Sequence, residues 1–165
     1  MERLVTRGTA ALSAVLLAVA APSADAQTAR DLEGTWTVVS AVAEQGGTRT
    51  DVLGPDPMGT LVFGADGRYA LIFLRRDLPK FVSNNRASGT PDENRAVVQG
   101  SIAHFGTYMV DEAGKALIFR IEGSTFPNWT GAEQRRPFAL RGDELTYTSP
   151  GSIGVATEVT VRRTK

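Results

Sequence analysis

Short runs of apolar and β-branched residues, separated by turn residues, make up most of the chain beyond residue 33. The runs cover residues 34–44, 59–63, 68–74, 101–110, 115–122, 135–140, 144–149 and 154–163. Strands of this length, spaced by turns and without long helical patterns between them, are typical of an antiparallel sandwich or barrel. The pattern therefore predicts an all-β fold of about eight strands.

Two segments between the runs carry signals of their own. Asp66-Gly67 stands between two apolar runs and is among the strongest short signals for a β-hairpin. In the long connection 75–100, Thr90-Pro91-Asp92-Glu93 offers a capping residue, a proline suited to the first helical position and a glutamate three residues after the cap. We therefore predict one short helix that ends near Gln99 and is closed by Gly100.

Residues 1–26 have the pattern of a secretory signal peptide. A charged start is followed by the uncharged apolar run Thr9–Ala21 and by small residues at Ala24 and Ala26. The alternative, a membrane anchor, needs about 20 apolar residues in succession, which is more than this run provides. We expect cleavage after Ala26, a single mature domain over residues 27–165, a periplasmic or secreted location and no stable membrane anchor.

The composition narrows the function classes. The chain has no cysteine, which excludes a disulfide framework, a thiol nucleophile and thiolate metal ligands. Its one histidine cannot build a histidine-rich metal site. The 18 Lys and Arg residues balance 18 Asp and Glu residues without a long block of like charge, so a nucleic-acid partner is not expected. The sequence predicts no metal and no cofactor, and it leaves the oligomeric state open.

Several short motifs follow one another along the predicted strands. They are Gly34-Thr35-Trp36, Pro57-Met58-Gly59 before Leu61-Val62-Phe63, Asp66-Gly67-Arg68-Tyr69, Gly89-Thr90-Pro91, His104-Phe105-Gly106-Thr107-Tyr108, and residues 122–131 with Phe126-Pro127-Asn128-Trp129. In this order and spacing, over about residues 32–161, they resemble the bacterial and fungal lipocalin-like domain family. The resemblance implies a closed antiparallel barrel of the calycin type, with the tryptophan of Gly-x-Trp packed across its closed end.

The resemblance also carries expectations about single residues. Family members typically have one or two histidines on the strand before Phe-Pro-Asn-Trp, where this chain has Phe119 and Arg120. This difference argues against an activity that depends on an imidazole there. In lipocalins an arginine on a late strand stacks on the Gly-x-Trp tryptophan, so we expect Arg135 or Arg136 to form a cation–π contact with Trp36.

A second arginine pair, Arg162-Arg163, lies at the end of the last predicted strand. We interpret both side chains as solvated.

Alternation along the predicted strands groups the polar candidates into faces. His104 and Tyr108 share one side of their strand, and Arg120 and Glu122 share the side opposite Phe119. Facing the lumen, Arg120 and Glu122 would form a buried pair able to orient a polar ligand, whereas outside they would be solvated. The apolar opposite side is the easier one to bury. The sequence does not give the strand register, however, and the register decides which side faces the lumen.

The candidate ligand-binding residues are polar and aromatic side chains of the strands together with one aromatic loop. They are Tyr69, Phe73, His104, Tyr108, Arg120, Glu122, Phe126, Asn128 and Trp129. His104 could serve as a general base, but a hydrogen-bonded barrel histidine without chemistry is the favoured interpretation. The loop 126–129 is either a lid over the barrel mouth or a plug packed against it.

Three functions are compatible with this pattern. The first is an exported barrel that binds a small, mostly apolar or amphipathic molecule in its lumen. The second is a cyclase- or isomerase-type enzyme that uses His104, Tyr108 and Glu122, and the third is a structural or stress-related periplasmic protein with a filled barrel and no ligand. We favour the first and assign no catalytic residue, because the fold alone does not choose among them.

Overall fold

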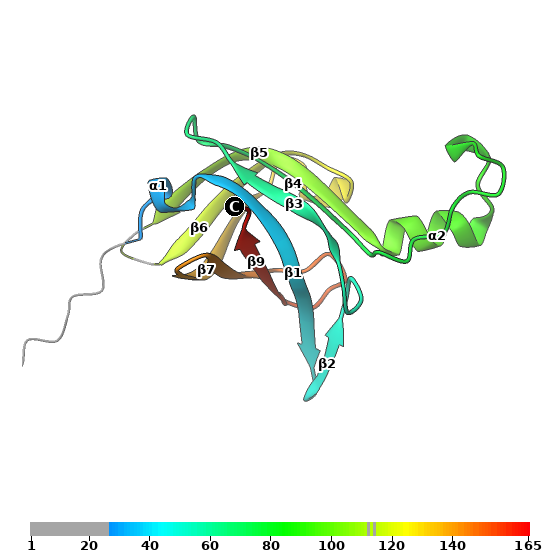
Figure 1. Cartoon of the computed structure of the whole chain (residues 1–165), viewed down its shortest axis with the longest axis horizontal. Helices are drawn as coiled ribbons and strands as arrows, with labels where there is room; N and C mark the ends of the chain where they lie inside the picture. Colours follow the sequence, from blue (N-terminus) through cyan, green and yellow to red (C-terminus); the bar gives the residue numbers. More distant parts are fainter. Residues whose placement is uncertain (1–26, 112, 114) are drawn as a thin grey trace, which may run out of the picture.

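Nine strands form one antiparallel sheet that curls round until its ends meet (Figure 1). The computed structural model describes residues 27–111, 113 and 115–165, so the predicted signal peptide lies outside the described residues. The strands are β1 (Gly34–Gln45), β2 (Thr48–Asp51), β3 (Met58–Phe63), β4 (Arg68–Leu74), β5 (Ser101–Asp111), β6 (Ala116–Ser124), β7 (Glu133–Arg141), β8 (Glu144–Ser149) and β9 (Thr157–Arg163). Neighbours pair in the order β2-β1-β3-β4-β5-β6-β7-β8-β9, and an additional β1–β9 pairing closes the barrel. The predicted all-β barrel of about eight strands is confirmed.

The ninth strand, β2, was not among the predicted strands. It pairs with the end of β1 beyond the part that pairs with β3, and all four of its residues are exposed. A strand without a buried face has no apolar alternation, so its sequence carries no strand signal. β9 starts three residues later than predicted, after Gly151 and Gly154, which both have a positive φ.

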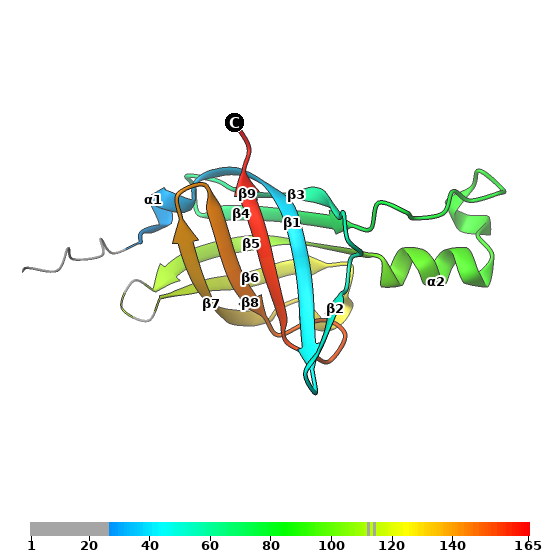
Figure 2. The ribbon, with the colours of Figure 1, turned by 60° about the horizontal axis from the view of Figure 1, so that its bottom comes forward.

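The predicted short helix is confirmed as α2 (Pro91–Gln99), with Gly100 as its C-cap. The Thr90 hydroxyl accepts from the Glu93 N–H, and the Glu93 carboxylate accepts from the N–H groups of Thr90 and Val82. Three further elements are single turns: α1 (Ala29–Leu32), η1 (Arg86–Ser88) and η2 (Pro127–Trp129). Figure 2 shows α2 and the connection before it projecting from one end of the barrel. No helix within the described part of the chain has the length and apolarity to span a membrane.

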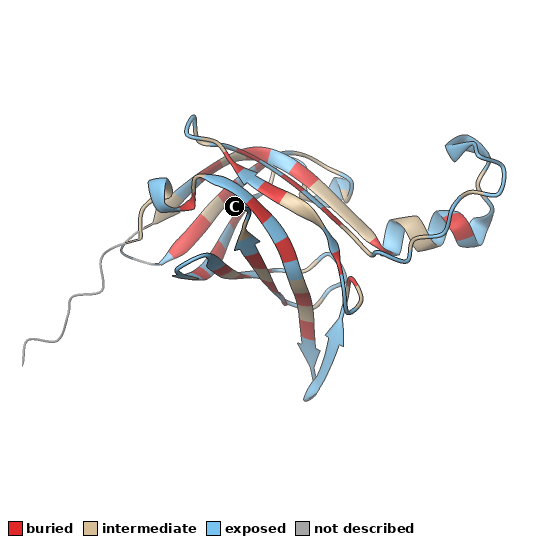
Figure 3. Ribbon diagram, viewed as in Figure 1, coloured by how far each residue is buried: buried red, intermediate tan, exposed pale blue. Residues whose placement is uncertain are grey.

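Buried and exposed residues alternate along the strands, which fixes the face that each strand turns to the lumen (Figure 3). On β6 the inward face carries Leu117, Phe119 and Ile121, and on β5 it includes His104 and Tyr108. The barrel core therefore consists of the inward rows of all eight strands, with Leu32 and Leu53 added from outside the strands.

One end of the barrel is sealed by α1 and the residue after it. The indole N–H of Trp36 donates to the Leu32 carbonyl at 2.8 Å, and both residues are fully buried. The Arg163 guanidinium lies 4.2 Å from the centre of the Trp36 ring and also donates to the Glu33 carbonyl. Arg163 thus ties β9, Trp36 and the α1 segment together.

The expected partner of Trp36 was therefore wrong. Arg135 faces outward and pairs with Asp111. Arg136 is buried in the lumen, where its guanidinium lies over the ring of Phe119 and not over Trp36. The β1–β9 register sets Trp36 directly opposite Arg163, so the arginine of the last strand makes the cation–π contact. We interpreted both Arg162 and Arg163 as solvated. This is right only for Arg162, which is exposed and pairs with Glu144.

We expect Arg163→Met to lower the free energy of unfolding by about 2 kcal/mol, because it removes the cation–π contact and the bonds to backbone carbonyls. Urea denaturation of the two adjacent variants measures the effect. The matched control, Arg162→Met, should change stability by less than about 0.5 kcal/mol, since it breaks only an exposed ion pair. Equal losses in the two variants would contradict the proposed seal.

Candidate functional site

Polar groups gather inside the barrel toward the end opposite α1. Tyr69 (β4), His104 (β5), Gln134 and Arg136 (β7) and Tyr147 (β8) are all buried, and all belong to the inward rows of their strands. Phe119 of β6 lies among them: its ring centre is 4.6 Å from that of Tyr69, 6.2 Å from His104 and 6.1 Å from Tyr147. We call Tyr69, His104, Gln134, Arg136 and Tyr147 the lumen cluster.

Tyr69 and His104 form a hydrogen-bonded pair. The Tyr69 hydroxyl lies 2.9 Å from Nδ1 of His104, and the two rings meet edge to face. Burial, reinforced by the positive charge of Arg136, lowers the pKa of His104 to about 3. Burial also raises the pKa of Tyr69 well above its usual value. At neutral pH both groups are therefore uncharged, and the favoured interpretation of a hydrogen-bonded barrel histidine fits this geometry.

Arg136 is the charged member of the lumen cluster. Its side chain is 1% exposed, and its Nε and Nη2 both donate to Oε1 of Gln134, at 3.1 and 2.6 Å. The guanidinium carbon lies 4.5 Å from the ring centre of Phe119 and 5.5 Å from that of Tyr147. Burial lowers the pKa of Arg136, and burial raises the pKa of Tyr147 to about 12. The barrel interior thus holds one cation among aromatic rings.

The loop between β6 and β7 covers this cluster. The half-buried Trp129, at the end of η2, has its ring centre 5.7 Å from that of His104 and 5.6 Å from the Arg136 guanidinium carbon. Phe126 contacts the other side of the indole, at 5.6 Å between ring centres, and Asn128 is exposed. The loop therefore rests its tryptophan on the lumen cluster, and of the three loop candidates only Trp129 touches the cluster.

Arg120 and Glu122 do not belong to the lumen, so their place in the candidate ligand-binding set is corrected. Both side chains are exposed on the outer face, where Arg120 pairs with Glu133 and Glu122 accepts two hydrogen bonds from Arg68. The reason is the pleat: Phe119 and Ile121 occupy the inward positions of β6, so the residues on either side of Ile121 point out.

The other strand candidates are placed in the core at different depths. Phe73 is buried near the end of β4 and belongs to the same hydrophobic core as Tyr69 and Tyr147. Tyr108 is also buried, but its hydroxyl donates to the Gly64 carbonyl at 3.1 Å, at the start of the β3–β4 turn. The three residues considered for an enzyme, His104, Tyr108 and Glu122, are therefore kept apart, with Glu122 outside the barrel.

Sequence reasoning missed Gln134, Arg136 and Tyr147 as functional candidates. A usable signal was present: Gln134, Arg136 and Phe138 alternate with the exposed Glu133, Arg135 and Pro137 on β7. Burying Phe138 also turns Arg136 inward. A buried arginine is uncommon enough that a pattern analysis assigns it to the surface by default.

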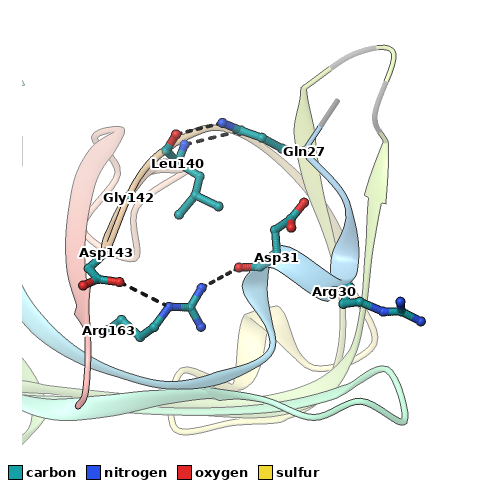
Figure 4. Close-up of a pocket in the computed structure, with 7 residues that line it drawn as sticks. All are labelled: Gln27, Arg30, Asp31, Leu140, Gly142, Asp143 and Arg163. Atoms are coloured by element: carbon teal, nitrogen blue, oxygen red, sulfur yellow. Dashed lines mark hydrogen bonds and ion pairs between the residues drawn. The ribbon is translucent and has the colours of Figure 1, made fainter. Parts of the chain in front are cut away.

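A hollow of about 540 Å³ lies at the sealed end of the barrel. Figure 4 shows the residues around it, between α1 and the β7–β8 turn: Gln27, Arg30, Asp31, Leu140, Gly142, Asp143 and Arg163. Its polar groups bind one another: Gln27 pairs with the backbone of Leu140, and Arg163 lies 3.7 Å from Asp143. Across the described residues no group of three or more potential metal ligands occurs. The lumen cluster is therefore the better candidate site.

The comparison with protein families agrees with the barrel. A family model described as a lipocalin-like domain matches residues 33–163. Among solved structures, a redesigned beta barrel is similar, with a TM-score of 0.45 and 14% sequence identity over 87% of this chain and 100% of that chain. No curated protein matches this chain.

The buried, neutral imidazole of His104 predicts a loss of stability in acid. Its pKa is about 3 in the folded protein and near 6.5 when unfolded, so the unfolded chain takes up the proton first as the pH falls. The stabilisation is complete above about pH 6.5 and is lost toward pH 3, with a slope approaching 1.4 kcal/mol per pH unit. Urea denaturation between pH 7 and pH 4 should show a shallower loss in His104→Gln than in the wild type. The same pH dependence of the free energy of unfolding in both proteins would contradict a buried, neutral His104.

Proposed function

Because the chain belongs to the lipocalin-like domain family, we propose that it is an exported barrel that binds a small, mostly apolar molecule in its lumen. A closed barrel of eight strands is just wide enough to hold one small ligand. Small-ligand sites commonly combine apolar and aromatic walls with a few polar groups that fix orientation. The lumen cluster, set among Phe119, Phe73 and Trp129, has this composition, and it is the observation that carries the proposal.

Trp129 is the group that a ligand would displace. It is only half buried, and its backbone hydrogen bonds are local: the Trp129 N–H donates to the Phe126 carbonyl, and the Trp129 carbonyl accepts from the Ala132 N–H. A single short turn is easier to move than a strand of the barrel wall. We infer that the loop 126–129 acts as a lid, and that Tyr69, His104 and Arg136 lie beneath it.

A filled barrel without a ligand is the second candidate. The side chains of Trp36, Phe63, Phe73, Phe119 and Tyr147 are all nearly or fully buried, so aromatic groups already occupy much of the interior. Such packing would serve stability alone if the lid never opened. A ligand-binding barrel should therefore yield a bound small molecule when ligands are searched for, whereas a filled barrel should yield none.

The binding proposal predicts an occupied barrel in protein purified from its native host. Native mass spectrometry should detect a small molecule that leaves on unfolding. A panel of lipids and aromatic metabolites should include compounds that raise the melting temperature, because a ligand that binds only the folded state stabilises it. In Trp129→Ala these compounds should associate faster, since the lid is shortened. A consistently empty barrel together with no thermal shift across the panel would favour the filled barrel.

Export is the other part of the proposal, and it rests on the sequence pattern of residues 1–26. We expect the intact mass of the protein from its native host to correspond to a chain that starts at Gln27. Substitution of both Ala24 and Ala26 by leucine should leave the chain uncleaved, because the processing site requires small residues. A full-length chain in the cytoplasmic fraction would contradict export.

A further inference from the structure

The lumen contains a positive charge without a counterion. Arg136 is 1% exposed, and none of the ion pairs among the described residues includes it. Its guanidinium donates to the neutral amide oxygen of Gln134, and the charged form is favoured by the phenols of Tyr147, which also hydrogen-bonds to it, and of Tyr69. Two nearby arginines, Arg120 of β6 and Arg135 of β7, both have carboxylate partners on the outer face.

Burial of the Arg136 guanidinium without a carboxylate partner has an unfavourable free energy. Transfer of a cation from water to a protein interior costs several kcal/mol, even after relaxation. Contacts with aromatic rings return about 0.5–2 kcal/mol, and a neutral amide returns less than a carboxylate. A guanidinium can hold a carboxylate through two parallel N–H···O bonds, which is the strongest pairing available to it. Gln134 occupies the position where such a group would sit.

The barrel wall is split next to Gln134. β7 pairs with β8 only over Phe138–Arg141, so residues 133–137 have no partner on that side. The Phe138 N–H points to β6, where it donates to the Lys115 carbonyl, so the nitrogen of Pro137 faces β8 and has no hydrogen to offer. Pairing between the two strands therefore stops at the proline.

A hollow of about 360 Å³ lies along this split. Its wall includes Gln134 and Pro137 from β7 and Thr148 and Ser149 from the end of β8. Gln134 thus borders the hollow, and its side-chain oxygen holds Arg136. Rotation of its amide into the hollow would free two guanidinium N–H groups and leave the amide hydrogen-bonded to water.

We propose that the ligand of the lumen is an apolar molecule with a carboxylate group, and that this carboxylate replaces the Gln134 amide oxygen on Arg136. The inference rests on the proposed binding function and adds the chemical class of the ligand. The apolar part lies against Phe119 and Trp129, and the negative charge supplies the counterion that the fold lacks. Gln134 holds the site closed when it is empty.

Matched pairs of probes test the charge requirement. Decanoate is compared with decan-1-ol, and 2-naphthoate with 2-naphthylmethanol, by isothermal titration calorimetry with the chain over residues 27–165 near pH 7, where the acids are ionised. In each pair the apolar part is the same, so the ratio of dissociation constants reports the head group. We expect the acid to bind roughly 10- to 100-fold more tightly than the alcohol in at least one pair.

Three variants locate the effect at Arg136. Arg136→Met should abolish the preference for the acid, so that the acid and the alcohol of each pair bind with similar affinity. Arg120→Met, the same substitution on the outer face, should keep the full preference. Gln134→Glu gives Arg136 a carboxylate of its own, so we expect a higher melting temperature and loss of the preference. This third variant retains its meaning if Arg136→Met fails to fold.

The outcomes separate the inference from the function on which it rests. Acid and alcohol of equal affinity in the wild type would overturn the carboxylate inference and leave lumen binding intact. A preference that survives in both Arg136→Met and Gln134→Glu would overturn it as well. No binding by any of the four probes would count against lumen binding itself, and the inference would fall with it.

Discussion

The pairing of the first barrel strand with the last is the constraint on which the rest of the structure depends. Seven residue pairs join β1 to β9, and they turn an open sheet with two edges into a wall with an inside and an outside. Once the wall is closed, the inward row of residues on each of the eight barrel strands is removed from water. The same register sets Trp36 opposite Arg163, so the pairing that closes the barrel also builds the seal at its end.

Closure also explains the electrostatics of the interior. Polar groups on inward positions can no longer use water, so they must find partners within the lumen. Among the described residues no fully buried side-chain nitrogen or oxygen lacks a hydrogen-bond partner. His104 meets the requirement as a neutral ring bonded to Tyr69, and Arg136 meets it with a neutral amide and aromatic rings. Hydrogen bonding of these groups is thus complete, whereas the charge of Arg136 has no carboxylate partner among the described residues.

The two ends of the barrel differ in how firmly they are held. At one end, backbone carbonyls of the α1 segment accept from Trp36 and Arg163, and the chain is tied across the wall. At the other end lie a one-turn loop over the lumen cluster, a split between β7 and β8, and the connection that carries α2. The stable end preserves the shape of the lumen, and the less constrained end is where a guest could displace Trp129 or Gln134.

The sequence by itself determined the strands that have a buried face, the Asp66-Gly67 hairpin and α2, because apolar alternation, turn residues and capping residues act locally. It could not give β2, whose residues are all exposed, nor the partner of Trp36, which depends on a pairing between strands more than a hundred residues apart. It likewise misplaced the charged site. Arg120 and Arg136 both lie in alternating strand segments of the sequence. Only the closed sheet places Arg120 in water beside Glu133 and Arg136 against aromatic rings in the lumen. The physical reason is that a strand's pattern defines two faces, whereas the long-range register selects which face is removed from water.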